Sequence, residues 1–339
     1  MTSRHLRLGT RGSQLALFQA NAVAALLRLQ EGITCDIIVI RTSGDRLAEA
    51  TLSEVGGKRL FVKEIEDALL AGDIDLAVHS SKDMPAALPD RLDVCAVLPR
   101  EDARDALVLP LRSGADLVGS ADVATLSLEE VVASLGPAPR IGTSSVRRSA
   151  QLVRLFPGAS FLPIRGNLDT RLRKVDGGDF DAIVLAAAGL RRLQQAHRIS
   201  AALPVDACVP APGQGIIAIE IRSGDIDVRS VIVQIDDRVS RLAFDAEREV
   251  VTRLGGGCQM PIGAFATVAD EEISVTAIVV SLDGARAIRA DVRGGVANPR
   301  DVGARAARQL LDQGAGDILA GAVERPGAQA QSPAERLQP

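Results

Sequence analysis

An alternation of strand-like and helix-like segments, which occurs twice, constrains the fold of this chain most. Strand-like residues 6–10 and 35–42 alternate with helix-like residues 13–29 and 61–72, and a similar alternation restarts near residue 139. Strands that alternate with amphipathic helices predict a mostly parallel sheet covered by helices. Because the pattern occurs twice, we expect two similar α/β lobes.

The pattern changes in the last third of the chain. The Pro- and Gly-rich segment PVDACVPAPGQG, residues 204–215, predicts a crossover and is followed by one more strand. A helix near 237–254, alternating strands over 262–293 and a helix near 300–312 then predict a smaller α+β domain. The expected division is 1–108 with 216–235 for the first lobe, 109–215 for the second, 236–325 for the third domain and 326–339 for a disordered tail.

Composition excludes several classes of function. The chain has 47% hydrophobic and 24% charged residues and neither Trp nor Tyr, so aromatic stacking on nucleic-acid bases is poorly supplied. A net charge of -4 also disfavours a general polyanion binder. The N-terminal residues lack an apolar signal-peptide core, and no apolar run long enough for a membrane span follows. We expect a cytoplasmic monomer that binds neither nucleic acid nor membranes.

Four cysteines are present and none forms a CxxC pair, so neither a zinc knuckle nor any other metal site is expected. Cys35 and Cys95 lie in apolar, strand-like runs and read as small buried hydrophobic residues, and Cys208 also reads as structural. Cys258 differs, because it follows three glycines in RLGGGCQMPIG. Three glycines cost backbone entropy and bury nothing, so this cysteine needs another explanation.

Basic residues concentrate in the middle of the chain. Between Arg140 and Arg198 there are 11 Arg or Lys residues and 4 acidic residues, although the whole chain is acidic. Four of the basic residues read as a solvated face, namely Arg154, Arg173, Lys174 and Arg198.

Other basic residues lie where a strand ends and a helix begins. Backbone N–H groups and hydroxyls at such junctions bind anions, and ligands of open α/β sheets collect at the carboxyl ends of strands. Arginine forks suit planar carboxylates, so a ligand with several carboxylates or phosphates is implied. The residues at these junctions are Arg11, Ser13, Arg147, Arg148, Arg165 and Arg171.

A carboxylate accompanies these cations in AVHSSKDMP, residues 77–85. Asp83 follows Lys82 directly after a predicted strand. A salt-bridged turn is the simpler interpretation. A carboxylate at the mouth of a positive cleft is also suited to moving a proton to a leaving amine and to stabilising a developing cation.

Eight motifs occur in an order that resembles one enzyme family. They are GTRGSQLAL, GGKRLFVKE, DLAVHSSKDMP, IGTSSVRR, IRGNLDTRL, DAIVLAAAGLRRL, PAPGQG and LGGGCQMPIGA. Together they resemble hydroxymethylbilane synthase, also called porphobilinogen deaminase, over roughly residues 4–325.

The resemblance implies a transferase of tetrapyrrole (haem) biosynthesis that joins four porphobilinogen molecules head to tail with loss of ammonia and releases linear hydroxymethylbilane. It implies a three-domain fold whose first two lobes are similar to type II periplasmic binding proteins. One dipyrromethane cofactor would be bound to Cys258 by a thioether, with Asp83 as the acid–base carboxylate. The other cofactor-binding residues it implies are Ser80, Lys82, Thr143, Ser144, Ser145, Arg147, Arg148 and Arg171. The substrate-binding residues it implies are Arg11, Ser13, Lys58, Arg165 and Arg192.

The chain departs from the family pattern at two places. Glu54 stands where many relatives have a lysine shortly before the GGK motif, and the connector at 110–126 is longer than usual. Any role of that lysine is therefore in doubt for this chain, and we assign no function to the connector.

Two other classes of protein remain open on the sequence. A non-enzymatic solute-binding protein also has two lobes around an anion cleft, but this interpretation leaves Cys258 and Asp83 without a function. A hydrolase with Cys258 as nucleophile needs a base, and His5, His79 and His197 lie in no recognisable pairing motif. We expect His79 to be a packed or hydrogen-bonded residue.

Overall fold

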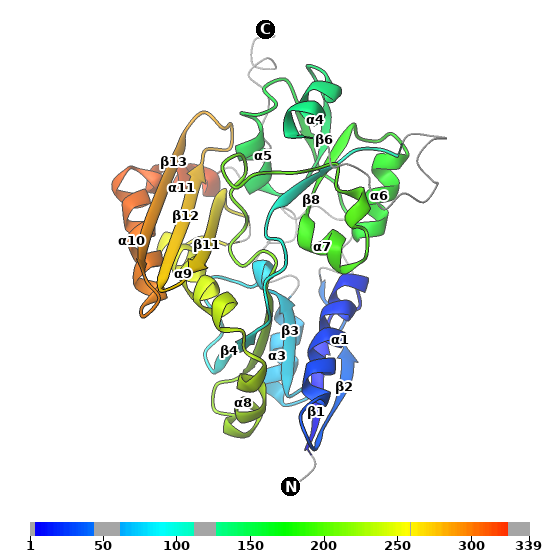
Figure 1. The fold of residues 1–339 in the computed structure, drawn as a ribbon, viewed down its shortest axis with the longest axis vertical. Helices are drawn as coiled ribbons and strands as arrows, with labels where there is room; N and C mark the ends of the chain where they lie inside the picture. Colours follow the sequence, from blue (N-terminus) through cyan, green and yellow to red (C-terminus); the bar gives the residue numbers. More distant parts are fainter. Residues whose placement is uncertain (1–3, 44–61, 112–126, 258, 325–339) are drawn as a thin grey trace.

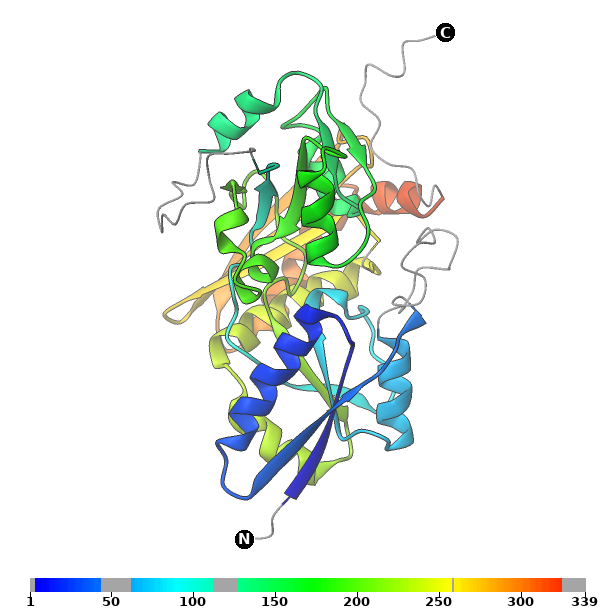
Figure 2. The same ribbon diagram turned by 90° about the vertical axis from the view of Figure 1, so that its right-hand side faces the viewer.

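The computed structural model describes residues 4–43, 62–111, 127–257 and 259–324. Two α/β lobes lie one above the other, and a third domain packs beside both of them (Figures 1 and 2). This arrangement confirms the predicted pair of α/β lobes with a smaller α+β domain.

The first lobe holds a five-stranded sheet in the order β2-β1-β3-β10-β4. Helices cover both faces of this sheet: α1 and α8 contribute Val23 and Ile232 to one core, and α3 contributes Leu69 to the other. The elements are β1 (Arg4–Thr10), α1 (Gln14–Arg28), β2 (Ile33–Val39), α3 (Lys63–Ala71), β3 (Leu76–Ser80), β4 (Leu92–Val97), β10 (Ile217–Arg222) and α8 (Ile226–Ile232).

The second lobe repeats this plan with the order β7-β6-β8-β5-β9. Its helices also lie in two cores, with Val131 and Leu152 in one and Val175 and Leu190 in the other. The elements are β5 (Asp105–Val108), α4 (Leu128–Leu135), β6 (Arg140–Gly142), α5 (Val146–Leu152), β7 (Ser160–Leu162), α6 (Leu168–Asp176), β8 (Ala182–Ala186), α7 (Ala187–Arg192) and β9 (Ala201–Ala202).

Each of the two sheets contains one strand that comes directly after the chain has crossed over from the other lobe. β5 follows β4 of the first lobe and lies antiparallel to β8 and β9, whereas β10 returns from the second lobe and lies antiparallel to β3 and β4. The division expected from the sequence placed residues 105–108 in the first lobe. Their pairing corrects this, and we place the boundary before Asp105.

The third domain is a three-stranded antiparallel sheet covered by helices. Its core joins Val250 of α9 and Leu310 of α10 to sheet residues such as Val275. The elements are α9 (Arg238–Leu254), β11 (Ile262–Ala269), β12 (Glu272–Val280), β13 (Ala287–Gly295), α10 (Pro299–Asp312) and α11 (Ala315–Glu324).

Short polar side chains begin α1 and α5, the helices that follow β1 and β6. Ser13 accepts a hydrogen bond from the N–H of Ala16 at the start of α1, and Ser145 accepts one from the N–H of Arg148 at the start of α5. Such N-caps fix where a helix begins and therefore where its first side chains point. None of the helices in the described part of the chain is long and apolar enough to cross a membrane.

Candidate active site between the two lobes

Most of the predicted site residues follow the carboxyl ends of strands. Arg11 and Ser13 come after β1, Ser80 ends β3, and Lys82 and Asp83 lie in the 3-10 turn that follows it. In the second lobe, Thr143, Ser144 and Ser145 connect β6 to α5, and Arg165 and Arg171 lie between β7 and the first turns of α6. Lys58 and Cys258 lie outside the described residues.

A pocket in the first lobe brings Asp83 together with Arg11, Ser13 and Ser80. Gln19 lines the same pocket, is 2% exposed, and donates from its amide to the hydroxyl of Ser80 at 2.8 Å. Gln19 was not predicted from the sequence. The available signal was a polar residue among the buried positions of an otherwise apolar helix.

Positively charged side chains from both lobes influence each other's pKa values near Asp83. Burial, reinforced by the charge of Arg148, lowers the pKa of Lys82 to about 8, while Asp83 and Asp105 oppose this change. Burial and Arg148 likewise lower the pKa of Arg171 to about 10, again against Asp83. Residues from two sheets therefore share one electrostatic environment, with Asp83 as a carboxylate among the cations.

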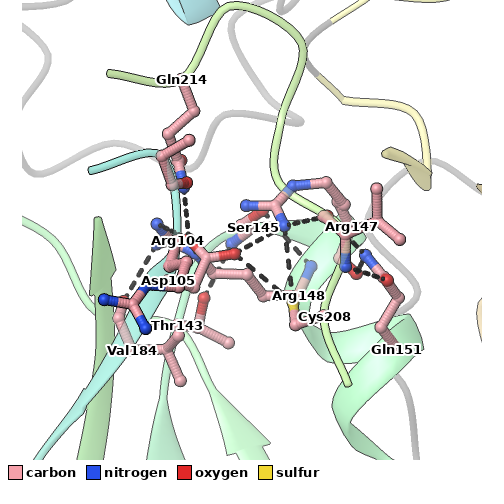
Figure 3. Close-up of polar contacts among 12 residues, drawn as sticks. Arg104, Asp105, Thr143, Ser145, Arg147, Arg148, Gln151, Val184, Cys208 and Gln214 are labelled. Atoms are coloured by element: carbon pink, nitrogen blue, oxygen red, sulfur yellow. Dashed lines mark hydrogen bonds and ion pairs between the residues drawn. The ribbon is translucent and has the colours of Figure 1, made fainter. Parts of the chain in front are cut away.

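Arg147 and Arg148 form the best-defined part of the site (Figure 3). Both are buried, with 4% and 6% exposure, and both contact the carboxylate of Asp105. Nη1 of Arg147 donates to Oδ2 of Asp105 at 2.7 Å, and Nε and Nη2 of Arg148 donate to Oδ1 at 2.9 and 2.7 Å. Asp105 was also missed, because its burial depends on the position of β5 between β8 and β9.

Gln214 of the PAPGQG motif connects this cluster to the first lobe. Its amide nitrogen donates to Asp105 at 2.9 Å, and its oxygen accepts from Nζ of Lys82 at 3.4 Å. Its side chain is fully buried. The crossover thus links the Asp83 segment to the arginine pair.

Several predicted binding residues use their side chains within the protein. Ser144 exchanges hydrogen bonds with the backbone of Ile164, and the hydroxyl of Thr143 accepts from the N–H of Ser145. Arg192 donates to the carbonyl of Gly215 at 2.7 Å, and so joins α7 to the crossover. These contacts hold the loops that follow the strands, and each hydroxyl or guanidinium keeps further hydrogen-bonding capacity.

The structural interpretation of three cysteines and one histidine is confirmed. Cys35, Cys95 and Cys208 are buried, and burial raises the pKa of the Cys208 thiol to about 12. His79 is buried and its Nε2 lies 3.1 Å from a carboxylate oxygen of Glu220.

The expectation of a solvated face was wrong for one arginine. Arg154 and Arg173 are exposed, but Arg198 is 7% exposed and pairs with Asp176 at 2.7 Å.

The glycines before Cys258 have different surroundings. Gly255 ends α9 with φ +64°, in the left-handed region that favours glycine. A Cβ at Gly256 would lie 2.3 Å from Cδ1 of Ile262, whereas one at Gly257 would meet nothing within 4 Å. The first two glycines are therefore explained by the helix end and by close packing. Gly257, next to Cys258, is free of close neighbours among the described residues.

Comparison with known proteins gives matches along most of the chain. Residues 6–230 match the family model "Porphobilinogen deaminase, dipyromethane cofactor binding domain", and residues 242–312 match "Porphobilinogen deaminase, C-terminal domain". Porphobilinogen deaminase of Syntrophobacter fumaroxidans is 43% identical over 94% of this chain and 98% of its own length. That of Syntrophotalea carbinolica is 45% identical over 94% of this chain and 96% of its own.

Solved structures give weaker matches. The VFT2 domain of Bordetella pertussis BvgS has a TM-score of 0.39 and 16% identity, covering 68% of this chain and 86% of that one. A probable amino-acid ABC transporter extracellular-binding protein from Bacillus subtilis has a TM-score of 0.38 and 8% identity, covering 69% and 90%. On the evidence of both family models and of these relatives, the chain belongs to the porphobilinogen deaminase family.

Proposed function

We propose that this protein is a hydroxymethylbilane synthase, a transferase that joins four porphobilinogen molecules head to tail with loss of ammonia. The growing chain would be attached to a dipyrromethane primer on Cys258 and released by hydrolysis as linear hydroxymethylbilane. The observation that carries this proposal is the hydrogen-bonded connection from Lys82, next to Asp83 in the first lobe, through Gln214 to Asp105 and the arginine pair of the second lobe. Family membership supports the same reaction.

The described cations fit a ligand rich in carboxylates. Each porphobilinogen carries an acetate and a propionate, so the ligand gains two negative charges with every ring. Arginine forks bind carboxylates in a bidentate manner, and charge-assisted hydrogen bonds are stronger in a partly buried cleft than at the surface. Arg147 has a buried Nε without a hydrogen-bond partner among the described residues, which is a free donor for such a group.

In the proposed reaction the protein residues have separate tasks. The dipyrromethane group, when bound, supplies the free α-carbon to which the first pyrrole is joined. Lys82, Ser80, Thr143, Ser144, Ser145, Arg147, Arg148 and Arg171 would hold its carboxylates, and Arg11, Ser13, Lys58, Arg165 and Arg192 would hold those of the substrate. Asp83 would protonate the departing amine, stabilise the pyrrole cation, and accept the α-proton after the new bond forms.

Intact mass tests the proposal directly. The purified protein is expected to be heavier than its sequence by two linked pyrroles, and Cys258→Ser should remove this excess. Cys95→Ala is a matched control at a cysteine that is buried in the first lobe, and should keep the excess. An unmodified wild-type mass would instead support the non-enzymatic solute-binding protein.

The location and assembly proposed here are those of a cytoplasmic monomer. Gel filtration with light scattering should give the mass of one chain, about 35.5 kDa plus the adduct.

The pKa of Lys82 predicts how binding of the dipyrromethane group to the apoprotein depends on pH. Because this pKa is lowered to about 8, the amine of the free protein loses its proton as pH rises through that value. A carboxylate of the dipyrromethane group favours the protonated amine, so affinity is fully present below about pH 8 and falls above it, by up to about tenfold per pH unit. Lys82→Arg keeps its charge throughout this range and should flatten the decline in loading of the apoprotein between about pH 7 and 9.5, measured by intact mass. An equal decline in both proteins would contradict this assignment.

A further inference from the structure

Asp105 differs from the other carboxylates near the site because two arginines share it. It lies at the start of β5, is fully buried, and accepts hydrogen bonds from Arg147, Arg148 and Gln214. Burial would raise the pKa of Asp105, but the charges of Arg147 and Arg148 outweigh it and hold that pKa far below its usual range. Asp105 is thus a permanent negative charge buried at the start of β5.

The two arginines use different hydrogen-bond donors to contact Asp105. Arg148 gives its Nε and Nη2 to Asp105 and its Nη1 to the carbonyl of Val184 at 2.9 Å. Arg147 uses only Nη1, which donates to Asp105 and to the carbonyl of Val209 at 2.8 Å. Figure 3 shows that Arg147 contacts Asp105 and Cys208 from one side of its guanidinium group.

The other side of Arg147 has no partner among the described residues. Its Nε is buried and makes no hydrogen bond, and no bond from its Nη2 is found within the described part of the chain. Nε and Nη2 form the side-on edge with which arginine binds a carboxylate through two parallel hydrogen bonds. A buried Nε without a partner is costly, so the geometry of this edge fits a ligand group that completes it.

The charges of the cluster lead to the same conclusion. Two guanidinium groups and one carboxylate leave one positive charge in excess, and Lys82, connected through Gln214, adds to it. One further carboxylate would neutralise the arginine pair. Without Asp105, two unpaired guanidiniums would have to be buried side by side, which is strongly unfavourable.

We propose that Asp105 is a positioning residue, an internal carboxylate that holds both arginines and presents the Nε–Nη2 edge of Arg147 to one carboxylate of the dipyrromethane group. Arg148 then acts mainly as a support, because its corresponding edge is already occupied. This inference rests on the proposed function, since it needs a ligand that bears carboxylates.

The test is the fraction of folded, purified protein that carries the adduct, measured by intact mass. Asp105→Asn keeps the shape but removes the charge, and should lower this fraction by at least about tenfold, the effect of losing one well-placed charged hydrogen bond. Asp102→Asn is the matched control, since Asp102 pairs only with Arg104 and Arg191 near the surface, and it should load as the wild type does. Full loading of folded Asp105→Asn would overturn the proposal.

A second pair of variants keeps the test decisive if Asp105→Asn does not fold. Arg147→Lys and Arg148→Lys both keep the charge, but only the first removes the unoccupied edge. Arg147→Lys should therefore lose more of the adduct than Arg148→Lys, and the reverse order would overturn the proposal. A wild-type protein without any adduct would instead refute the proposed function itself.

Discussion

Replacing Asp83 with alanine is expected to lower the turnover number by about 100- to 10,000-fold, the range contributed by one positioned acid–base group. The reason lies in its surroundings. Asp83 shares a pocket with Arg11, Ser13 and Ser80, and its charge acts on Lys82 and Arg171. No other described carboxylate lines that pocket. Removing it leaves the departing amine without a proton donor and leaves the pyrrole cation among positive charges.

The measurement is steady-state release of ammonia by protein whose adduct has been verified by mass. Asp90→Ala, an exposed carboxylate on the same lobe, is the control and should retain activity. Asp83→Glu separates charge from placement: it should keep more activity than alanine but less than the wild type. Near wild-type turnover in Asp83→Ala would remove this residue from the mechanism.

The largest effect on stability is expected at Glu247 of α9. This carboxylate is fully buried and accepts hydrogen bonds from three separate segments. Nη1 of Arg100 donates at 2.5 Å, and the N–H groups of Gly213 and Ala266 each donate at 2.6 Å. Arg100 lies just after β4, Gly213 lies in the crossover, and Ala266 lies in β11. Glu247 therefore ties the third domain to both connections between the lobes.

Glu247→Ala should lower the free energy of unfolding by about 3–5 kcal/mol, because the partly buried Arg100 loses its carboxylate partner and two buried N–H groups lose their acceptor. In a thermal melt we expect Tm to fall by about 4–7 °C. Glu249→Ala on the same helix removes only a pair with the exposed Arg253, so its effect should stay below about 1 kcal/mol. Similar melting curves for both variants would show that the junction is not held by Glu247.

The fold was largely predictable because local patterns mark its elements. Ser13 before an amphipathic run gave the start of α1, and Asp237 did the same for α9. β5 was placed in the wrong lobe because its membership is set by pairing with β8 and β9, which follow much later in the chain. Four residues of strand carry too little local signal to show which sheet they join.

The candidate site was predictable to the extent that it depends on strand ends and charge. Arg147 and Arg148 were found because they begin a helix after a strand. Asp105 was not found, because in EDARDA it looks like any surface acid until β5 buries it. Arg198 was misread for a similar reason, since its partner Asp176 is 22 residues away. Residue pairs that form only through tertiary contacts cannot be predicted from local sequence patterns.

The exchange of strands between the lobes also sets the order in which this protein can be completed during synthesis. The second lobe uses a continuous stretch from β5 to β9 and can close its sheet once that stretch has left the ribosome. The first lobe cannot, because β10 must enter between β3 and β4, which until then present unpaired edges. The part of the protein made first is therefore finished after the part made second, and a nascent chain that stalls before residue 217 exposes an open sheet prone to aggregation.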